Sequence, residues 1–249
     1  MTPDPNPSVA LDFTLQVERL YAALFRLATD EEPNLGGKLL YAGELAAASR
    51  ALLVAANIAG AASLAATADV AAQKQAVRDG VADFLVNSLD EALRILKNEI
   101  RKRETVAVCI AAAPQGVERE MLERGVLPDL LAPHFRSGSP SFGHTVPHIE
   151  AFPAPASQVL VTWGVATAPA QWLPKLDAIA LDCLPATPDH ETLAARRWLR
   201  VAPRYLGRLA QATRVLRCEL NIAKQIVECV QSAVEGGEFA IEVHIAITR

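Results

Sequence analysis

Hydrophobic residues recur along the first half of the chain with two different spacings. Between residues 11 and 28, apolar positions three or four residues apart predict an amphipathic helix, which we expect to cover a surface of the domain or of a partner subunit. From residue 37 to residue 132, short apolar runs alternate with helical periodicity. Two of the runs, Asp83–Val86 and Val106–Ala112, are expected to be short buried strands. The alternation predicts a parallel sheet with helices on both faces.

A helix start is recognisable between these two runs. Ser88 is followed three residues later by Glu91, and apolar residues then recur at Leu89, Leu93, Leu96 and Ile100. A serine and a glutamate at this spacing are typical of a capping box, in which each side chain bonds a backbone N–H group of the first turn. We therefore expect a helix that begins directly after Ser88.

The C-terminal part of the chain has a different pattern. Residues 159–165 and 239–247 alternate apolar with polar side chains, which predicts strands with one exposed face, hence antiparallel or edge pairing. In the last strand we expect burial of every second residue: Phe239, Ile241, Val243, Ile245 and Ile247. Helical periodicity occupies the segment between the strands, over residues 196–216 and again over 219–234. The second of these helices has an apolar face wide enough for a core position or a subunit interface.

These patterns divide the chain into four parts. We expect an N-terminal helix or cap over residues 1–30, a Rossmann-like domain over 31–135, a loop or linker over 136–157 that is rich in Pro, Ser, Gly and His, and an α+β region over 158–249. The predicted fold class is therefore α/β, with a C-terminal α+β part that contains an antiparallel or edge strand.

Blocks of sequence in the second of these parts resemble a known family. The blocks occur in the family's order with nearly ungapped spacing: Gly37–Gly43, Ala55–Gly60, Ser88–Leu96, Arg124–Val126 and Pro128–Asp129. Together residues 37–140 resemble the NAD-binding domain of urocanase (urocanate hydratase). The resemblance implies a Rossmann-like fold and, in the family, a tightly bound NAD that acts as an electrophile on urocanate.

The positions that would face the cofactor depart from the family pattern. After Gly43 the family has a glycine-rich turn of the kind GGMGGAQP, whereas this chain has Glu44–Ala51, with Glu44 and Ala47 in the turn. Glycines in such a turn let backbone N–H groups approach a pyrophosphate, and an acidic side chain there would repel it. The family's ribose-binding glutamate aligns with Thr67, although Asp69 lies close by, and the family's QTSAHD run aligns with His134–Ser139. We therefore expect that NAD binding is lost.

A second candidate site lies in the loop after the sheet. His134, Arg136 and Ser137 follow the carboxyl end of a predicted strand, where open α/β sheets place their ligands, so they are candidates for contacting a small anion. His144 and His148 have the spacing of a helical metal pair, but Pro147 removes the helix that would align them. We expect no metal site, and no motif identifies a catalytic residue.

Four arginines at four-residue spacing, Arg196, Arg200, Arg204 and Arg208, form what we call the arginine ridge. The ridge could contact a phosphate, a nucleic acid or an acidic partner, but charge runs on amphipathic helices are more often solvated faces. Pro203 could also interrupt the helix that carries them. Whether the ridge binds a partner stays open.

Composition narrows the possible partners. A net charge of −4 and an isoelectric point near 5.8 argue against general binding of nucleic acid or membranes. The four cysteines lack CxxC spacing, so we expect reduced packing cysteines in a cytoplasmic protein. The edge-like last strand makes a homodimer a natural expectation.

Two function classes follow. The first is a non-catalytic or repurposed urocanase-superfamily protein that binds an unknown small molecule or serves in assembly. The alternative is an active enzyme, either a urocanate-hydratase-like lyase or another small-molecule enzyme that uses the crevice near His134 and Arg136.

Overall fold

A computed structural model places the chain in two compact units. The structure describes residues 7–29, 33–132, 142, 157–186, 189–207 and 212–248. One unit, here called the Rossmann-like unit, spans Gln16–Phe152, and the other, the C-terminal unit, comprises Met1–Leu15 and Pro153–Arg249. Helix α1 (Pro7–Phe25) therefore contributes residues to both units and begins and ends a few residues before the predicted helix.

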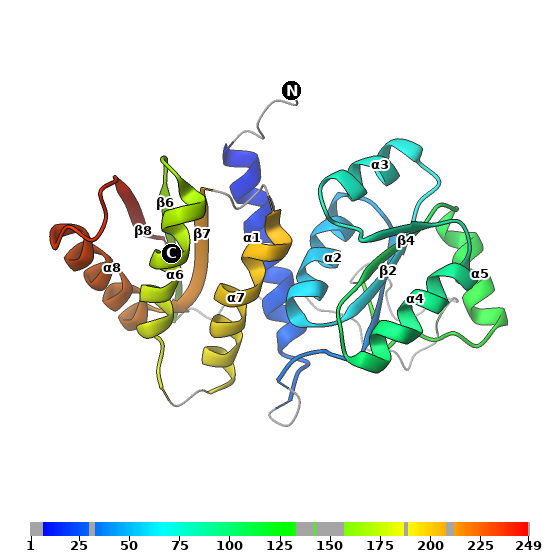
Figure 1. The fold of residues 1–249 in the computed structure, drawn as a ribbon. Coiled ribbons are helices and arrows are strands. Elements are labelled where there is room, and N and C mark those ends of the chain that lie inside the picture. Colours follow the sequence, from blue (N-terminus) through cyan, green and yellow to red (C-terminus); the bar gives the residue numbers. More distant parts are fainter. Residues whose placement is uncertain are drawn as a thin grey trace. The chain divides into compact units, whose positions relative to one another are not determined.

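The Rossmann-like unit is built on a five-stranded parallel sheet with the order β3-β4-β2-β1-β5 (Figure 1). The strands are β1 (Leu39–Glu44), β2 (Ala62–Ala66), β3 (Phe84–Val86), β4 (Ala107–Ile110) and β5 (Leu130–Leu131). The helices that connect them are α2 (Ala47–Ala59), α3 (Val70–Arg78), α4 (Leu89–Lys102) and α5 (Pro114–Glu123).

The direction of each crossover decides which face of this sheet a helix covers. Helices α2 and α3 lead from β1 to β2 and from β2 to β3, towards the β3 edge of the sheet. Helices α4 and α5 lead from β3 to β4 and from β4 to β5, towards the β5 edge. Because such crossovers are right-handed, the two pairs lie on opposite faces, and Figure 1 shows α2 on one side of the sheet and α4 with α5 on the other. The predicted parallel sheet with helices on both faces is confirmed.

Strand β3 differs from the expectation of a buried strand. Phe84 is 47% exposed and Leu85 is 40% exposed, whereas every residue of β4 is buried. The reason is position, because β3 lies at the edge of the sheet and β4 lies between two strands. An apolar run alone does not distinguish an edge strand from a central one.

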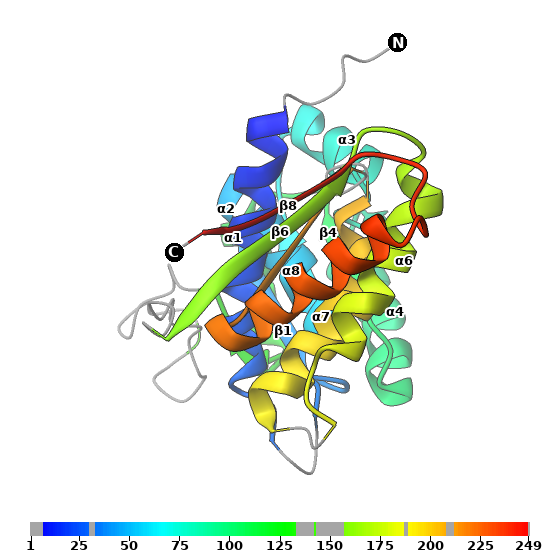
Figure 2. The same cartoon turned by 90° about the vertical axis from the view of Figure 1, so that its left-hand side faces the viewer.

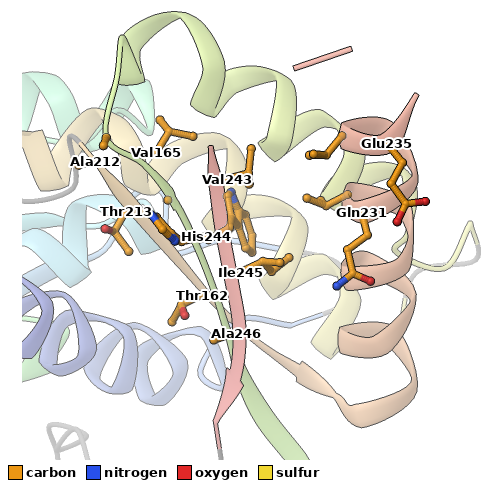
Figure 3. A pocket seen from close by; sticks show the side chains of 15 residues that line it. Thr162, Val165, Ala212, Thr213, Gln231, Glu235, Val243, His244, Ile245 and Ala246 are labelled. Atoms are coloured by element: carbon orange, nitrogen blue, oxygen red, sulfur yellow. The ribbon is translucent and has the colours of Figure 1, made fainter. Parts of the chain in front are cut away.

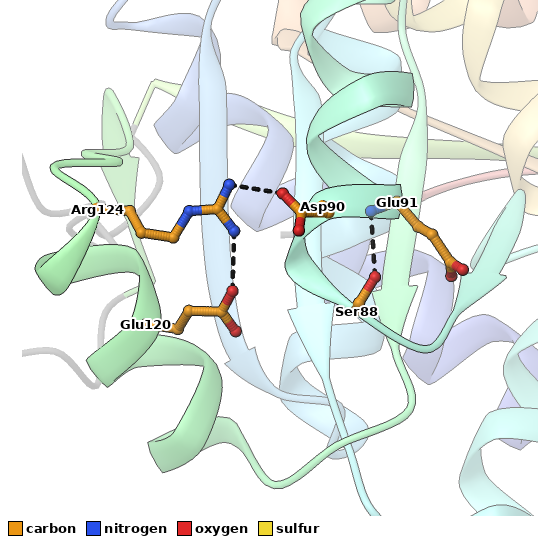
Figure 4. Close-up of polar contacts among 5 residues, drawn as sticks. All are labelled: Ser88, Asp90, Glu91, Glu120 and Arg124. Atoms are coloured by element: carbon orange, nitrogen blue, oxygen red, sulfur yellow. Dashed lines mark hydrogen bonds and ion pairs between the residues drawn. The ribbon is translucent and has the colours of Figure 1, made fainter.

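The start of α4 confirms the predicted cap. Ser88 Oγ accepts a hydrogen bond from the Glu91 backbone N–H at 3.3 Å, and the Glu91 carboxylate accepts one from the Asn87 N–H at 2.9 Å. Figure 4 shows the Ser88 contact beside Arg124, which follows α5 and donates to Asp90 at 2.6 Å and to Glu120 at 2.9 Å. These contacts fix the first turn of α4 and join it to α5.

The C-terminal unit contains a three-stranded antiparallel sheet with the order β7-β6-β8. Its strands are β6 (Gln158–Val165), β7 (Thr213–Glu219) and β8 (Val243–Thr248), and its helices are α6 (Pro169–Asp182), α7 (His190–Leu206) and α8 (Leu220–Glu235). Helices α6 and α8 pack against each other and against β6, and Figure 2 shows α8 running beside β6.

The last strand is antiparallel and lies at an edge of this sheet, as predicted. Glu242 and His244 are exposed, and the apolar residues between them alternate in the predicted phase. Of the five residues expected to be buried, only Phe239 is buried, and the other four are half-buried. The strand also begins at Val243 instead of at Phe239.

Strand β7 corrects the sequence interpretation of residues 196–216. One helix was expected through this range, but α7 ends at Leu206 and Gly207 follows with a φ of 52°. Pro203 lies within the last turn of α7 without ending it. Residues 213–219 pair with β6 over seven consecutive positions, so tertiary pairing overrides the helical spacing that was read through Leu216.

Candidate functional site

The carboxyl edge of the parallel sheet is the place where a Rossmann-like fold would hold a ligand. Strand β1 has β2 on one side and β5 on the other, and the chain reaches these neighbours by crossovers in opposite directions. The crevice outside the carboxyl ends of β1 and β5 is therefore the topological switch point, where open α/β sheets bind ligands.

The turn from β1 to α2 is short and is bonded to its own chain. Gly43 has a φ of 69°, and the register with β2 shifts between Tyr41 and Glu44. The Leu45 N–H donates to the Ala66 carbonyl at 3.0 Å, and the Ala46 N–H donates to the Glu44 carbonyl at 2.8 Å. Two backbone donors of this turn are therefore directed into the protein instead of into the crevice.

Helix α2 begins at Ala47, with Ala46 as an N-cap that supplies no side-chain hydrogen bond. The apolar side chains that follow are buried along most of α2, from Ala51 to Ala59. The helix is thus fixed by packing against β1 and β2, and its first turn carries methyl groups where the family's turn carries glycines.

Glu44 places a negative charge at this end of the sheet. Its side chain is exposed at the end of β1. Burial raises the pKa of the Cys109 thiol on β4 to about 11, and the charge of Glu44 adds to that rise. Burial likewise raises the pKa of Tyr41, with contributions from Glu118, whose carboxylate accepts from the Tyr41 hydroxyl at 3.2 Å, and from Glu44. The field of Glu44 therefore extends over the carboxyl ends of β1 and β4.

Thr67 occupies the position after β2, where a ribose-binding acid would lie. Its side chain is buried, and its hydroxyl accepts from the Asp69 N–H at 3.2 Å. Its carbonyl accepts from Gln73 Nε2 at 2.9 Å. Asp69, the nearest acid, caps α3 by accepting from the Ala71 N–H at 2.8 Å. Both side chains thus serve the connection between β2 and α3.

The other predicted candidates could not be placed at the crevice. His134, Arg136, Ser137, His144 and His148 all lie outside the described residues. Within the described ranges, no group of three or more His, Cys, Asp or Glu side chains could hold a metal ion. Of the predicted site residues, the structure thus places Gly43, Glu44, Ala47 and Thr67, and all four lie near the carboxyl ends of β1 and β2.

The arginine ridge is divided among different environments. Arg196 is half-buried and donates to the carbonyls of Leu184 at 3.0 Å and Pro185 at 2.9 Å, which fixes the connection between α6 and α7. Arg200 and Arg204 are exposed, and the Arg204 guanidinium lies 5.4 Å from the ring centre of Tyr205. Arg208 lies outside the described residues.

Sequence reasoning missed a buried polar cluster in the C-terminal unit. Asp177 on α6 accepts from Trp163 Nε1 at 3.0 Å and pairs with Arg214 Nε at 3.0 Å. Burial raises the pKa of Asp177, while Arg214 and Trp163 lower it. Little in the sequence pointed to this cluster. Asp177 and Arg214 lie far apart in the sequence, and Arg214 falls in the segment that was predicted as a helix, so no sequence spacing links the two residues.

An open cavity of about 1100 Å³ lies beside the antiparallel sheet of the C-terminal unit, and β6, β8 and α8 contribute to its lining (Figure 3). Gln231 and Glu235 extend from α8 on one side of β8, and Thr162, Thr213 and His244 supply the other polar groups. Successive residues of a strand point to opposite faces, so His244 and Thr162 lie on the face away from Val243 and Ile245. These polar groups do not converge on one point, and we assign no ligand to the cavity.

The parallel sheet with its switch point and its helix start after β1 defines a Rossmann-like domain. A family model, the urocanase Rossmann-like domain, matches residues 18–149, and the chain therefore belongs to the urocanase family. The match covers nearly the whole Rossmann-like unit. None of the helices in the described ranges is long and apolar enough to cross a membrane.

Proposed function

We propose that this chain is a urocanase-family protein that has lost NAD binding and urocanate hydratase activity, and that it is a non-catalytic or repurposed module for small-molecule binding or assembly. The observation that carries the proposal is the turn between β1 and α2. There the amides of Leu45 and Ala46 are bonded within the chain, and Glu44 supplies a negative charge. A pyrophosphate at a helix start needs free N–H groups and a positive field.

The size of the expected loss follows from the contacts involved. A hydrogen bond to a charged group contributes about 1.5–3 kcal/mol. Losing two or three such contacts, at the pyrophosphate and at the ribose, weakens binding by roughly 10²–10⁶. Repulsion between Glu44 and the pyrophosphate acts in the same direction.

The direct test is calorimetry with NAD on the purified full chain, together with thermal unfolding at millimolar NAD. We expect no measurable heat of binding and no change in Tm, because a ligand that does not bind the native state does not stabilise it. A urocanase-family protein that retains the glycine-rich turn is the positive control. Micromolar affinity, or NAD that copurifies with the chain, would refute the proposal.

The enzyme alternative rests on topology. Strand β5 ends at Leu131, at the switch point, and His134 and Arg136 follow it in the sequence. Incubation with urocanate, with and without added NAD, separates the two functions. Disappearance of urocanate that requires Arg136, as judged by an Arg136→Gln variant that still folds, would establish the enzyme and reject the non-catalytic module.

A further inference from the structure

Helix α8 has a row of apolar side chains that its own unit covers only in part. Leu220, Val227 and Val234 recur every seven residues, so they form one stripe along the helix, here called the apolar stripe. All three are half-buried, whereas Ile226 and Val230 on the adjacent face are buried. The apolar stripe therefore lies at the margin of the face by which α8 packs against the sheet.

The apolar stripe lies on the flank of α8 that is nearest to β8. Gln231, Val234 and Glu235 of α8 line the cavity of about 1100 Å³ together with Val243 and Ile245 of β8 (Figure 3). Both of these β8 side chains are half-buried, and no further strand of the described chain follows β8 in the sheet. Apolar surface of a helix and apolar surface of a strand thus adjoin the same sheet edge. A contiguous strip of this kind is typical of a surface that packs against another chain.

Two charged side chains border the apolar stripe. Lys224 and Glu235 are about three turns apart on α8, which places them on the same flank of the helix. Both are exposed, and within the ranges that the structure describes neither side chain forms an ion pair or a hydrogen bond. Glu235 lies in the last turn, where the helix dipole disfavours an anion, so its charge does not stabilise α8 itself.

We propose that two copies of the chain associate along this surface, with α8 against α8 and β8 beside β8, across a two-fold axis perpendicular to the sheet. The axis reverses the direction of every element, so the Lys224 end of one α8 meets the Glu235 end of the other. The arrangement forms two Lys224–Glu235 ion pairs and packs one apolar stripe against the other. The inference concerns the C-terminal unit alone and does not depend on the loss of NAD binding.

The dimensions of the sheet allow this contact. Helix α8 packs against both β6 and β8, so its axis lies within about one strand spacing of the β8 edge. Because paired strands are about 4.8 Å apart, the two α8 axes would be roughly 10–14 Å apart in the joined sheet. Packed helices are usually about 8–10 Å apart, and the long side chains of Lys224 and Glu235 bridge the larger separation.

The charges favour a second copy over a partner of a different kind. A surface that is acidic throughout would be repelled by Glu235, and one that is basic throughout would be repelled by Lys224. The two-fold image of the flank itself places each charge opposite its complement.

Charge reversal tests the inference, with sedimentation velocity of the full chain over a range of protein and salt concentrations. The unmodified chain should dimerise, and high salt should weaken the dimer. Lys224→Glu should raise the dimer Kd roughly tenfold, because like charges then face each other twice, and high salt should tighten this dimer instead. Lys224→Glu combined with Glu235→Lys restores both pairs and should return the Kd to that of the unmodified chain.

Lys175→Glu is the matched control, because it makes the same charge change at an exposed position on α6. It should leave the Kd unchanged. Lys224 and Glu235 are exposed, so thermal unfolding of the variants should give the Tm of the unmodified chain.

Three results would overturn the inference. One is an unmodified chain that stays monomeric at the highest concentration measured. The second is a dimer whose Kd is the same in Lys224→Glu, or is not restored in the double variant. The third is a dimer of the unmodified chain that high salt does not weaken, a result that requires no variant to fold.

Discussion

At the scale of single residues, the most consequential group is the buried cluster of Asp177, Arg214 and Trp163. The ion pair joins α6 to β7, and the side chains of Asp177 and Arg214 are only 11% and 14% exposed. Removing two charges from water costs about as much as their attraction returns, so such a pair adds little net stability. Removing one partner is different, because it leaves the other charge buried without compensation.

We predict that Arg214→Gln destabilises the C-terminal unit by about 3 kcal/mol at neutral pH. All three tryptophans of the chain, Trp163, Trp172 and Trp198, belong to this unit, so denaturant unfolding followed by tryptophan fluorescence reports on it. Adding Asp177→Asn to the variant should recover part of the loss, because the uncompensated charge is then gone. A double variant whose loss equals the sum of the single losses would show that the two residues do not interact.

The same variant should show a pH dependence with a defined sign. The pKa of Asp177 is raised by burial even with Arg214 present, and loss of Arg214 raises it further. A carboxyl group with a raised folded-state pKa contributes stability that is fully present below the unfolded pKa and is lost as the pH rises through the folded one. The cost of Arg214→Gln should therefore shrink as the pH is lowered through that window.

At the scale of elements, the cap of α4 gives a test in the Rossmann-like unit. We predict that Ser88→Ala destabilises this unit by about 1 kcal/mol, because the Glu91 N–H loses its side-chain acceptor. The unit contains no tryptophan, so hydrogen exchange of the α4 amides is the appropriate measurement. Ser88→Asp keeps an acceptor at the N-cap and is the control. Equal exchange in Ser88→Ala and in the unmodified chain would show that the cap contributes nothing.

The elements also show where sequence patterns succeed and where they fail. Local chemistry identified the start of α4 at Ser88 and the alternation in β8. Patterns failed where neighbours decide the outcome. Phe84 is exposed because β3 lies at an edge, and residues 213–216 form a strand because β6 is available to pair with them.

In the candidate site, too, some features could be predicted from the sequence and others could not. That Glu44 and Thr67 stand in place of a glycine and an acid follows from the resemblance to the family pattern, without a structure. That the Leu45 and Ala46 amides are bonded within the chain, or that Asp69 caps α3, depends on backbone positions that only the structure gives.

At the scale of the whole molecule, the family match and the fold point to a two-part protein. The urocanase Rossmann-like domain ends at residue 149 in the match, and the antiparallel sheet of the C-terminal unit lies beyond it. The C-terminal unit therefore supplies features that the matched domain does not define: the buried ion pair and an antiparallel sheet whose edge strands are β7 and β8.

The two edge strands of that sheet, β7 and β8, differ in the hydrogen bonds that their outward backbone groups make. At the β7 edge, Trp198 of α7 donates to the Val215 carbonyl at 2.6 Å. The Val215 carbonyl therefore points away from β6. On the other side of the ladder, the Val165 N–H donates to the Ala212 carbonyl, so the odd-numbered residues of β6 form hydrogen bonds with β7. The even-numbered residues of β6 form theirs with β8. It follows from the register that Val243, Ile245 and Ile247 direct their N–H and C=O groups outward from β8.

A row of outward donors and acceptors can pair with the same row of a second copy across a two-fold axis. We therefore predict a homodimer formed through β8, measured by light scattering over a range of concentrations. Ile245→Pro removes one outward N–H without breaking a bond to β6 and should shift the chain to a monomer, whereas Ile245→Ala keeps the N–H and controls for the lost side chain. Thermal unfolding of both variants checks that the C-terminal unit remains folded. An unmodified chain that stays monomeric at the highest concentration would reject the dimer. If the chain is instead a dimer that Ile245→Pro leaves intact, the interface lies elsewhere.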